Sequence, residues 1–147
     1  MMKLRIPIAR VSRELMVPAL EALTAINEEL LSSGRFPLLY SAGVRYQNEP
    51  PGFEDWDPAD RVLMRGWGDC EDLAAWRAAE LRLAGEDDAR ADTYVSRVRP
   101  DGSRVWHAIT VRGDGSVEDP SLILGMRRHR GHARQGLPFR AVMSGHR

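Results

Sequence analysis

The chain has 147 residues, of which 43% are hydrophobic and 29% are charged, and its formal net charge is zero. This length and composition are typical of one globular domain, and the balanced charge creates no overall field that attracts nucleic acid or a membrane surface. Residues 1–20 lack the uninterrupted apolar segment of a signal peptide, and no run reaches the roughly 18 apolar residues of a membrane helix. Because the single cysteine cannot form an internal disulfide, we expect a cytoplasmic protein.

In chain order, the first predicted element is a helix over residues 12–33, where apolar side chains recur at helical spacing. Ser12 can cap its start and Gly34 can end it. Pro18 favours a helix that starts nearer Val17, because proline is tolerated best in the first turn.

An irregular segment and two more helices follow. Residues 58–66 suit a short helix, and residues 69–84 suit a longer one that ends at Gly85. A polar connection over residues 86–91 leads into three candidate strands, at 92–99, 104–112 and 116–119. Residues 35–60 are expected to be irregular because of five breakers: Pro37, Pro50, Pro51, Gly52 and Pro58.

The turn between the first two strands predicts a register. With Asp101-Gly102 as a two-residue turn, Val98 faces Val105, Ser96 faces His107 and Tyr94 faces Ile109. This register places His107 on the apolar face of the second strand, with Val105, Ile109 and Val111. We therefore expect His107 to point inward, toward the helix over residues 69–84.

The turn between the second and third strands determines where Asp119 points. A two-residue turn at Asp114-Gly115 would place Asp119 on the face opposite His107. A three-residue loop over residues 113–115, with Gly115 in the left-handed region, places it diagonal to His107 on the same face. Diagonal side chains are about 7–8 Å apart, within reach of a carboxylate and an imidazole. We predict the three-residue loop.

Cys70 is the only cysteine and opens the helix over residues 69–84. The unpaired N–H groups and positive dipole of a helix start favour a thiolate, and the same N–H groups can hold the oxyanion of a tetrahedral intermediate. Asp69, Glu71 and Asp72 oppose the thiolate, although they can also cap the helix or line a site for a basic substrate. Cys70, His107 and Asp119 are thus candidates for nucleophile, base and orienting carboxylate.

Each of these residues also has an ordinary structural interpretation. A lone buried cysteine usually packs as a small apolar residue, and a histidine on an apolar strand face is usually a satisfied core residue. Thiol, imidazole and carboxylate are zinc ligands as well, but no paired Cys or His spacing supports a metal site, and we expect neither metal nor cofactor. The order of the three residues, on elements expected to face each other, favours a catalytic triad.

The sequence Gly68-Asp69-Cys70-Glu71-Asp72-Leu73-Ala74 resembles the nucleophile motif of transglutaminase-like proteins, a branch of the papain-like thiol superfamily. Trp106-His107-Ala108 and Asp119-Pro120 resemble the later motifs of that family, in the same order. The resemblance covers about residues 60–122. It implies an α+β fold with N-terminal helices and a nucleophile-bearing helix packed on an antiparallel sheet. It also implies a Cys70, His107 and Asp119 triad.

The resemblance leaves the remaining site residues open. In relatives, the side-chain donor of the oxyanion hole lies upstream of the cysteine, where Gln47, Trp56 and Tyr46 are candidates. Asp69 and Trp106 are further candidates for the substrate cleft. Trp56 has an alternative place in the core.

On this basis, residues 1–147 are expected to be one transglutaminase-like domain, with a helical N-terminal part (12–34) and a basic C-terminal tail from about residue 125. The predicted function is thiol-dependent cleavage of a peptide, isopeptide or other amide bond in a peptide or protein substrate. An amine-accepting transglutaminase is one alternative. Another is a non-catalytic structural or assembly protein, phage-related and associated with the virion, whose tail docks a protein partner. The tail contains six Arg and three His after residue 120 and no acid, but with Phe139 alone it is a poor platform for nucleic acid.

Overall fold

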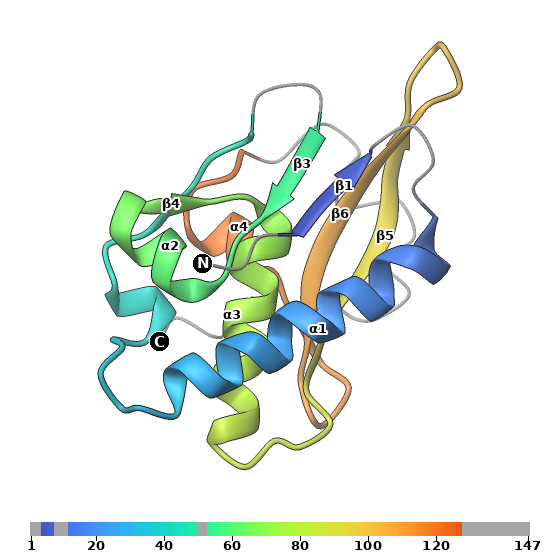
Figure 1. Cartoon of the computed structure of the whole chain (residues 1–147). Helices are drawn as coiled ribbons and strands as arrows, with labels where there is room; N and C mark the ends of the chain where they lie inside the picture. The colour runs from blue at the N-terminus through green and yellow to red at the C-terminus, as the bar shows by residue number, and fades with distance from the viewer. Residues whose placement is uncertain (1–3, 8–11, 50–52, 128–147) are drawn as a thin grey trace.

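Helix α3 (Cys70–Leu83) lies at the centre of the fold and packs against helix α1 (Arg13–Leu31) and a three-stranded sheet, which α1 also contacts directly (Figure 1). The structure is a computed structural model and describes residues 4–7, 12–49 and 53–127. Three alanines of α3, Ala74, Ala75 and Ala78, are fully buried, and their small side chains let the neighbouring elements approach closely. Met16, Leu20 and Leu23 of α1 pack into the same core.

Short elements complete the described part of the chain. A 3-10 turn, η2 (Leu39–Ser41), follows α1, helix α2 (Ala59–Arg65) precedes α3, and helix α4 (Pro120–Ile123) follows the last strand. The strands are β1 (Leu4–Pro7), β2 (Arg45–Tyr46), β3 (Phe53–Trp56), β4 (Trp67–Gly68), β5 (Arg90–Val98), β6 (Arg104–Val111) and β7 (Val117–Glu118).

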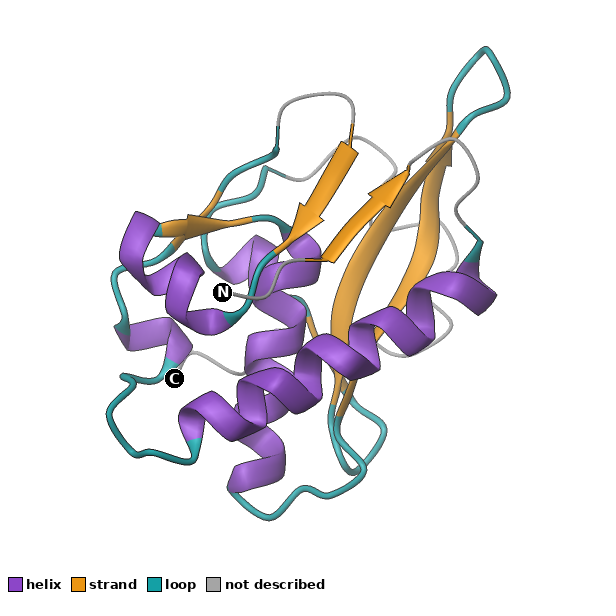
Figure 2. Ribbon diagram, viewed as in Figure 1, coloured by secondary structure: helices purple, strands orange, loops and turns teal. Residues whose placement is uncertain are grey.

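The strands form three small sheets, of which the largest carries the candidate site residues. β5, β6 and β7 form an antiparallel sheet in that order, while β1 pairs antiparallel with β3 and β2 pairs parallel with β4. Figure 2 shows the long strands β5 and β6 standing beside the helices. The predicted α+β class is therefore confirmed, with α3 packed on the antiparallel sheet.

Helix α1 differs from the prediction at its start. It begins at Arg13, directly after Ser12, and continues through Pro18, so the expected start near Val17 is wrong. Proline removes one backbone hydrogen bond from the helix. The buried side chains of Met16 and Leu20 on either side of Pro18 hold this turn against the core.

The segment expected to be irregular, residues 35–60, contains η2, β2 and β3. Its strands are two to four residues long, and they pair with β1 and β4. Because neither pair is joined by a tight hairpin turn, the sequence contains no turn signal that would predict them. Helix α4 was not predicted either, because it is four residues long and begins at the proline of an Asp-Pro pair that is equally typical of a turn.

The register of the β5–β6 hairpin is not the predicted one. Val98 lies opposite Arg104, and Tyr94 lies opposite His107 rather than Ile109. Two local features cause the difference. The turn closes with hydrogen bonds between Arg99 and Ser103, which makes it a three-residue loop, and the register then shifts again at Ser96.

The β6–β7 turn is the predicted three-residue loop. Arg112 N–H donates to the Ser116 carbonyl at 2.8 Å, Thr110 pairs with Glu118, and Gly115 has a φ of 86°. A left-handed residue at the end of a three-residue hairpin loop favours glycine. The next position after Glu118 is Asp119, which this register carries to the same face as His107.

That face is not the one that α3 covers. Thr110 Oγ1 donates to the Ala74 carbonyl at 2.9 Å, and Ala108 packs with the alanines of α3. Because side chains alternate along a strand, His107 and Ile109 lie on the opposite face, where Ile109 belongs to a separate apolar cluster. His107 is buried, as expected, but the expectation that it points toward the helix over residues 69–84 is wrong.

Most of the predicted basic tail, residues 128–147, lies outside the described residues. Among the helices described, none is both long and apolar enough to cross a membrane.

Candidate active site

Cys70 is the first residue of α3, and the chain holds this helix start rigidly. Asp69 is the N-cap, and its Oδ1 accepts the Asp72 N–H at 3.2 Å. Asp72 Oδ2 in turn accepts the Asp69 N–H at 3.3 Å, which completes a reciprocal capping box. Cys70 therefore lies at the positive end of the helix dipole, as predicted.

The Cys70 sulfur is buried, with 8% of the residue exposed, and it donates a hydrogen bond to Glu71 Oε2 at 3.2 Å. Burial raises the pKa of the thiol well above its ordinary value, and the charges of Glu71 and Asp69 raise it further. The Ala108 backbone acts in the opposite direction by hydrogen bonding to the sulfur. In this conformation Cys70 is therefore a neutral thiol at neutral pH.

His107 and Asp119 form a buried pair. His107 Nε2 lies 2.7 Å from Asp119 Oδ2, and both residues are at most 5% exposed. Asp119 also caps α4, where its Oδ1 accepts the Leu122 N–H at 3.3 Å. When the neutral ring donates a hydrogen bond from Nε2–H to the carboxylate, its acceptor lone pair is on Nδ1.

Cys70 belongs to the same region of the molecule as this pair. The short strand β7 pairs with β6 only at Thr110 and Val111. The β6 backbone at Ala108 is therefore not covered by β7, and it hydrogen bonds to the Cys70 sulfur. The phenols of Tyr46 and Tyr94 each interact electrostatically with both Cys70 and Asp119.

Two tyrosines line the region: Tyr46, one of the candidate oxyanion donors, and Tyr94, which the sequence did not place in the site. The Tyr94 ring meets the His107 ring edge-on, with centroids 5.7 Å apart. Tyr46 packs against the core cluster that contains Cys70, and its hydroxyl donates to Asn48 Oδ1. Burial is the main cause that raises the pKa of both phenols, so both are hydrogen-bond donors at neutral pH.

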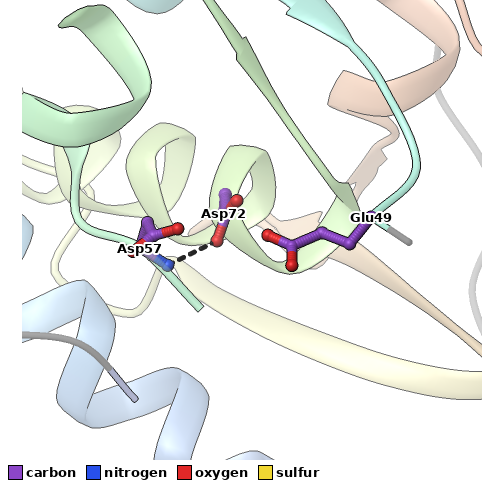
Figure 3. Close-up of side chains that lie close together, drawn as sticks. All are labelled: Glu49, Asp57 and Asp72. Atoms are coloured by element: carbon purple, nitrogen blue, oxygen red, sulfur yellow. Dashed lines mark hydrogen bonds between the residues drawn. The ribbon is translucent and has the colours of Figure 1, made fainter. Parts of the chain in front are cut away.

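A buried ionic network lies beneath the start of α3. Arg65 donates to Asp57 Oδ2 at 2.6 Å and to Asp72 Oδ2 at 2.8 Å. The Asp57 backbone N–H also donates to Asp72 Oδ1 at 2.7 Å, as the dashed line in Figure 3 marks. Asp72 thus fixes the first turn of α3 to the loop that precedes α2, and so fixes the position of Cys70.

This network also contains the described carboxylates that come closest to a metal-binding arrangement. Oxygen atoms of Glu49, Asp57 and Asp72 lie within 4.8 Å of one another (Figure 3). Arg65 already contacts all three, at 3.9 Å from Glu49, and Arg61 Nε lies 3.1 Å from Asp57 Oδ1. Because guanidinium groups supply the positive charge here, we propose no metal ion at these residues.

The remaining candidate residues occupy different surroundings. Trp56 is fully buried in the core with Met16 and Leu20, which agrees with its structural interpretation. Gln47 is exposed, and its Oε1 accepts a hydrogen bond from Arg45. Asp69 is the buried cap of α3, and half-buried Trp106 packs against the same core cluster as Cys70. Of the upstream candidates for an oxyanion donor, Tyr46 is the one whose hydroxyl interacts with the region of the thiol.

From the sequence, Glu71 and Asp72 were charges that oppose the thiolate or possible helix caps, and the structure gives each a specific contact. The Asp69-x-x-Asp72 spacing is a capping-box pattern that could have identified Asp72. No sequence pattern indicates that Glu71 folds back onto Cys70, since neighbouring helical residues normally point apart.

A surface hollow of about 690 Å³ lies at the other end of α3, away from Cys70. Its lining is polar and exposed for the most part and includes Glu86, Asp88, Arg112 and Asp114. It contains none of the candidate site residues.

No protein-family model matches the chain, and neither a curated protein nor a solved structure matches it significantly.

Proposed function

We propose that the protein is a thiol-dependent acyltransferase that cleaves a peptide, isopeptide or other amide bond, with Cys70 as nucleophile and His107 as base. The observation that carries the proposal is the buried 2.7 Å contact between His107 and Asp119, in the same region as the only cysteine of the chain. A carboxylate that holds Nε2–H orients an imidazole so that Nδ1 can take a proton from a nucleophile.

The reaction begins from a neutral thiol. As the sulfur bonds to the amide carbonyl carbon, the thiol proton passes to His107 and the carbonyl oxygen becomes an oxyanion. The Cys70 backbone N–H, at the start of α3, is the first donor proposed for that oxyanion. The Tyr46 hydroxyl, which donates to Asn48 in the free protein, is the second, and its one hydrogen turns from Asn48 to the oxyanion. His107 then protonates the leaving amine nitrogen, the C–N bond breaks, and a thioester remains on Cys70.

The acceptor that resolves the thioester defines the product. Water gives a carboxylic acid and regenerates the thiol, while a primary amine gives a new amide. We favour hydrolysis, and an amine-accepting reaction is the alternative. The resemblance of the Cys70, His107 and Asp119 motifs to transglutaminase-like proteins supports either reaction, and on that basis we propose a member of the papain-like superfamily acting on peptide or protein substrates.

An activated ester tests the proposal without knowledge of the natural substrate. The full chain is mixed with p-nitrophenyl acetate, and the release of p-nitrophenol and the mass of the intact protein are followed. We expect a rapid phase that places one acetyl group on Cys70, and hydroxylamine should remove it as expected of a thioester. Cys70→Ala and His107→Ala should lack this phase, while the exposed control Ser33→Ala should retain it.

Equal acetylation rates in the wild type and in folded His107→Ala would contradict the proposal. Adding a primary amine during turnover separates the two acceptors, because a new amide product appears only if the amine competes with water.

A second function is favoured by the burial of the thiol. A sulfur that is largely covered and hydrogen-bonded to Glu71 also suits a protein that uses this fold for assembly, without catalysis. In that case Cys70→Ala would leave the biological activity and partner binding of the protein intact.

A further inference from the structure

Glu71 makes an unusual contact with the residue that precedes it. Consecutive residues in a helix point about 100° apart and do not normally face each other. Here, in the first turn of α3, the Glu71 carboxylate accepts the Cys70 thiol hydrogen at 3.2 Å. Only 2% of Glu71 is exposed, so the negative charge acts on the sulfur with little screening from water.

Most groups around the sulfur oppose its ionisation. α3 itself contributes the carboxylates of Asp69 and Glu71, and burial removes the solvation that a thiolate needs. The phenols that interact with the sulfur belong to β2 and β5, and the candidate base and its carboxylate lie on β6 and before α4. The full set comprises Asp69, Glu71, Tyr46, Tyr94, His107 and Asp119, together with the Ala108 backbone, which favours the thiolate.

We infer that Glu71 is a further functional residue of this site, which contacts the reacting sulfur and holds Cys70 as a neutral thiol until a substrate arrives. The relevance of this contact to a reaction rests on the proposed function, in which Cys70 is the nucleophile. The carboxylate accepts the hydrogen bond but does not remove the proton, which passes to His107 when the sulfur bonds to the substrate carbonyl. The thiol is thereby protected from alkylating and oxidising agents, which react with thiolate.

Glu71→Gln tests the inference, because it removes the charge and keeps the size of the side chain. The rate of alkylation of the folded, full-length protein by iodoacetamide is measured across neutral and alkaline pH. We expect the midpoint of the rate profile to fall by about one pH unit in Glu71→Gln, which raises the rate about tenfold below the midpoint. Glu14→Gln, an exposed residue of α1, is the matched control and should leave the profile unchanged.

Glu71→Asp provides the second variant, since it keeps the charge but withdraws it from the sulfur. Its midpoint should fall by less than that of Glu71→Gln. Circular dichroism at each pH restricts the comparison to folded protein, and if Glu71→Gln does not fold, the shift in Glu71→Asp decides. An unchanged or raised midpoint in the folded variants would overturn the inference. Alkylation needs no substrate, so this result is separate from the p-nitrophenyl acetate test, in which His107→Ala reports on the proposed function.

Discussion

His107 Nε2 lies 2.7 Å from Asp119 Oδ2, and the length of the loop between β6 and β7 is what permits this contact. A loop shorter by one residue would turn Asp119 to the other face of the sheet, because side chains alternate along a strand. The left-handed conformation of Gly115 closes the three-residue loop and thereby sets the pairing of His107 with Asp119.

Replacing Asp119 with alanine removes two interactions, the contact with His107 and the cap of α4. We expect the free energy of unfolding to fall by about 2–4 kcal/mol, from the loss of a charge-assisted hydrogen bond and of an N-cap. Asp119→Asn keeps one acceptor oxygen, which can serve either the α4 cap or His107 but not both, and it should lose less than Asp119→Ala. Urea denaturation measures both variants, and equal stability of Asp119→Ala and wild type would contradict the role given to this carboxylate.

The tautomer of His107 can be observed directly. Donation from Nε2 to Asp119 predicts that the proton of the neutral ring is on Nε2, and long-range ¹H–¹⁵N NMR spectra distinguish the two ring nitrogens. An Nδ1-protonated ring in the wild type would remove the acceptor that the proposed reaction needs. The other three histidines lie outside the described residues, so His107→Gln is required to assign the signal.

Arg65 is expected to be the most sensitive member of the ionic network. Its removal leaves the Asp72 carboxylate without its cation and Asp57 with Arg61 alone, and both carboxylates are at most 1% exposed. We predict that Arg65→Ala lowers the free energy of unfolding by about 3–5 kcal/mol, the usual cost of breaking a buried ion pair. Arg35→Ala, at an exposed site, is the control.

Arg65→Lys gives a finer reading of the same network. Lysine keeps the charge but lacks the planar fork that contacts both carboxylates, so its stability should lie between those of Arg65→Ala and wild type. Arg65→Ala as stable as the Arg35→Ala control would show that the network contributes nothing to the position of α3.

Gly68, the first residue of the nucleophile motif, lies where the packing leaves little room for a side chain. A Cβ at this position would lie 3.1 Å from Leu73 and 3.2 Å from Asp72 and Val62. We expect Gly68→Ala to push β4 away from the start of α3 and to cost about 1–3 kcal/mol in unfolding experiments. Gly113→Ala is the matched control, because its Cβ would meet only Glu86 on the surface, and it should lose less.

Alkaline pH should unfold the protein. All three tyrosines and Cys70 have pKa values raised in the folded state, with burial as the first cause. A raised pKa favours the protonated folded state, so its contribution is complete below the unfolded values, about 8.5 for Cys and 10 for Tyr, and is lost as pH rises above them. Thermal stability should therefore decline in that range.

Absorbance of the phenolates and circular dichroism, followed together against pH, check this expectation. We expect the phenolates of the native protein to appear only as it unfolds. In concentrated urea, where the chain is already unfolded, they should appear near the ordinary tyrosine pKa of about 10. Tyrosines that ionise near that pH while the dichroism stays native would contradict the burial of these phenols.

Several features could be predicted from the sequence because local chemistry determines them. α3 has a capping aspartate at Asp69, an alanine-rich interior and a left-handed glycine, Gly85, just past its end. The loop before Asp119 also followed from its own residues, since Gly115 suits the left-handed position of a three-residue turn. The candidate residues Cys70, His107 and Asp119 were identified at this level.

The first hairpin shows where local chemistry is insufficient. Pro100, Asp101 and Gly102 fit either a two-residue or a three-residue turn, and the shift at Ser96 has no local sequence signature. As a result, the residue opposite His107 on β5 is Tyr94. The packing of α3 on the other face of β6, where Thr110 contacts Ala74, was equally beyond local sequence patterns.

The sequence by itself therefore determined the long helices, the strands β5, β6 and β7, and the candidate residues Cys70, His107 and Asp119, because capping, turn geometry and side-chain period act over a few neighbouring positions. Only the tertiary structure decided that Glu71 meets the Cys70 sulfur and that Arg65 joins Asp57 to Asp72 under α3. These contacts depend on burial, which removes water from charges and makes their exact partners matter, and burial is a property of the whole packed chain.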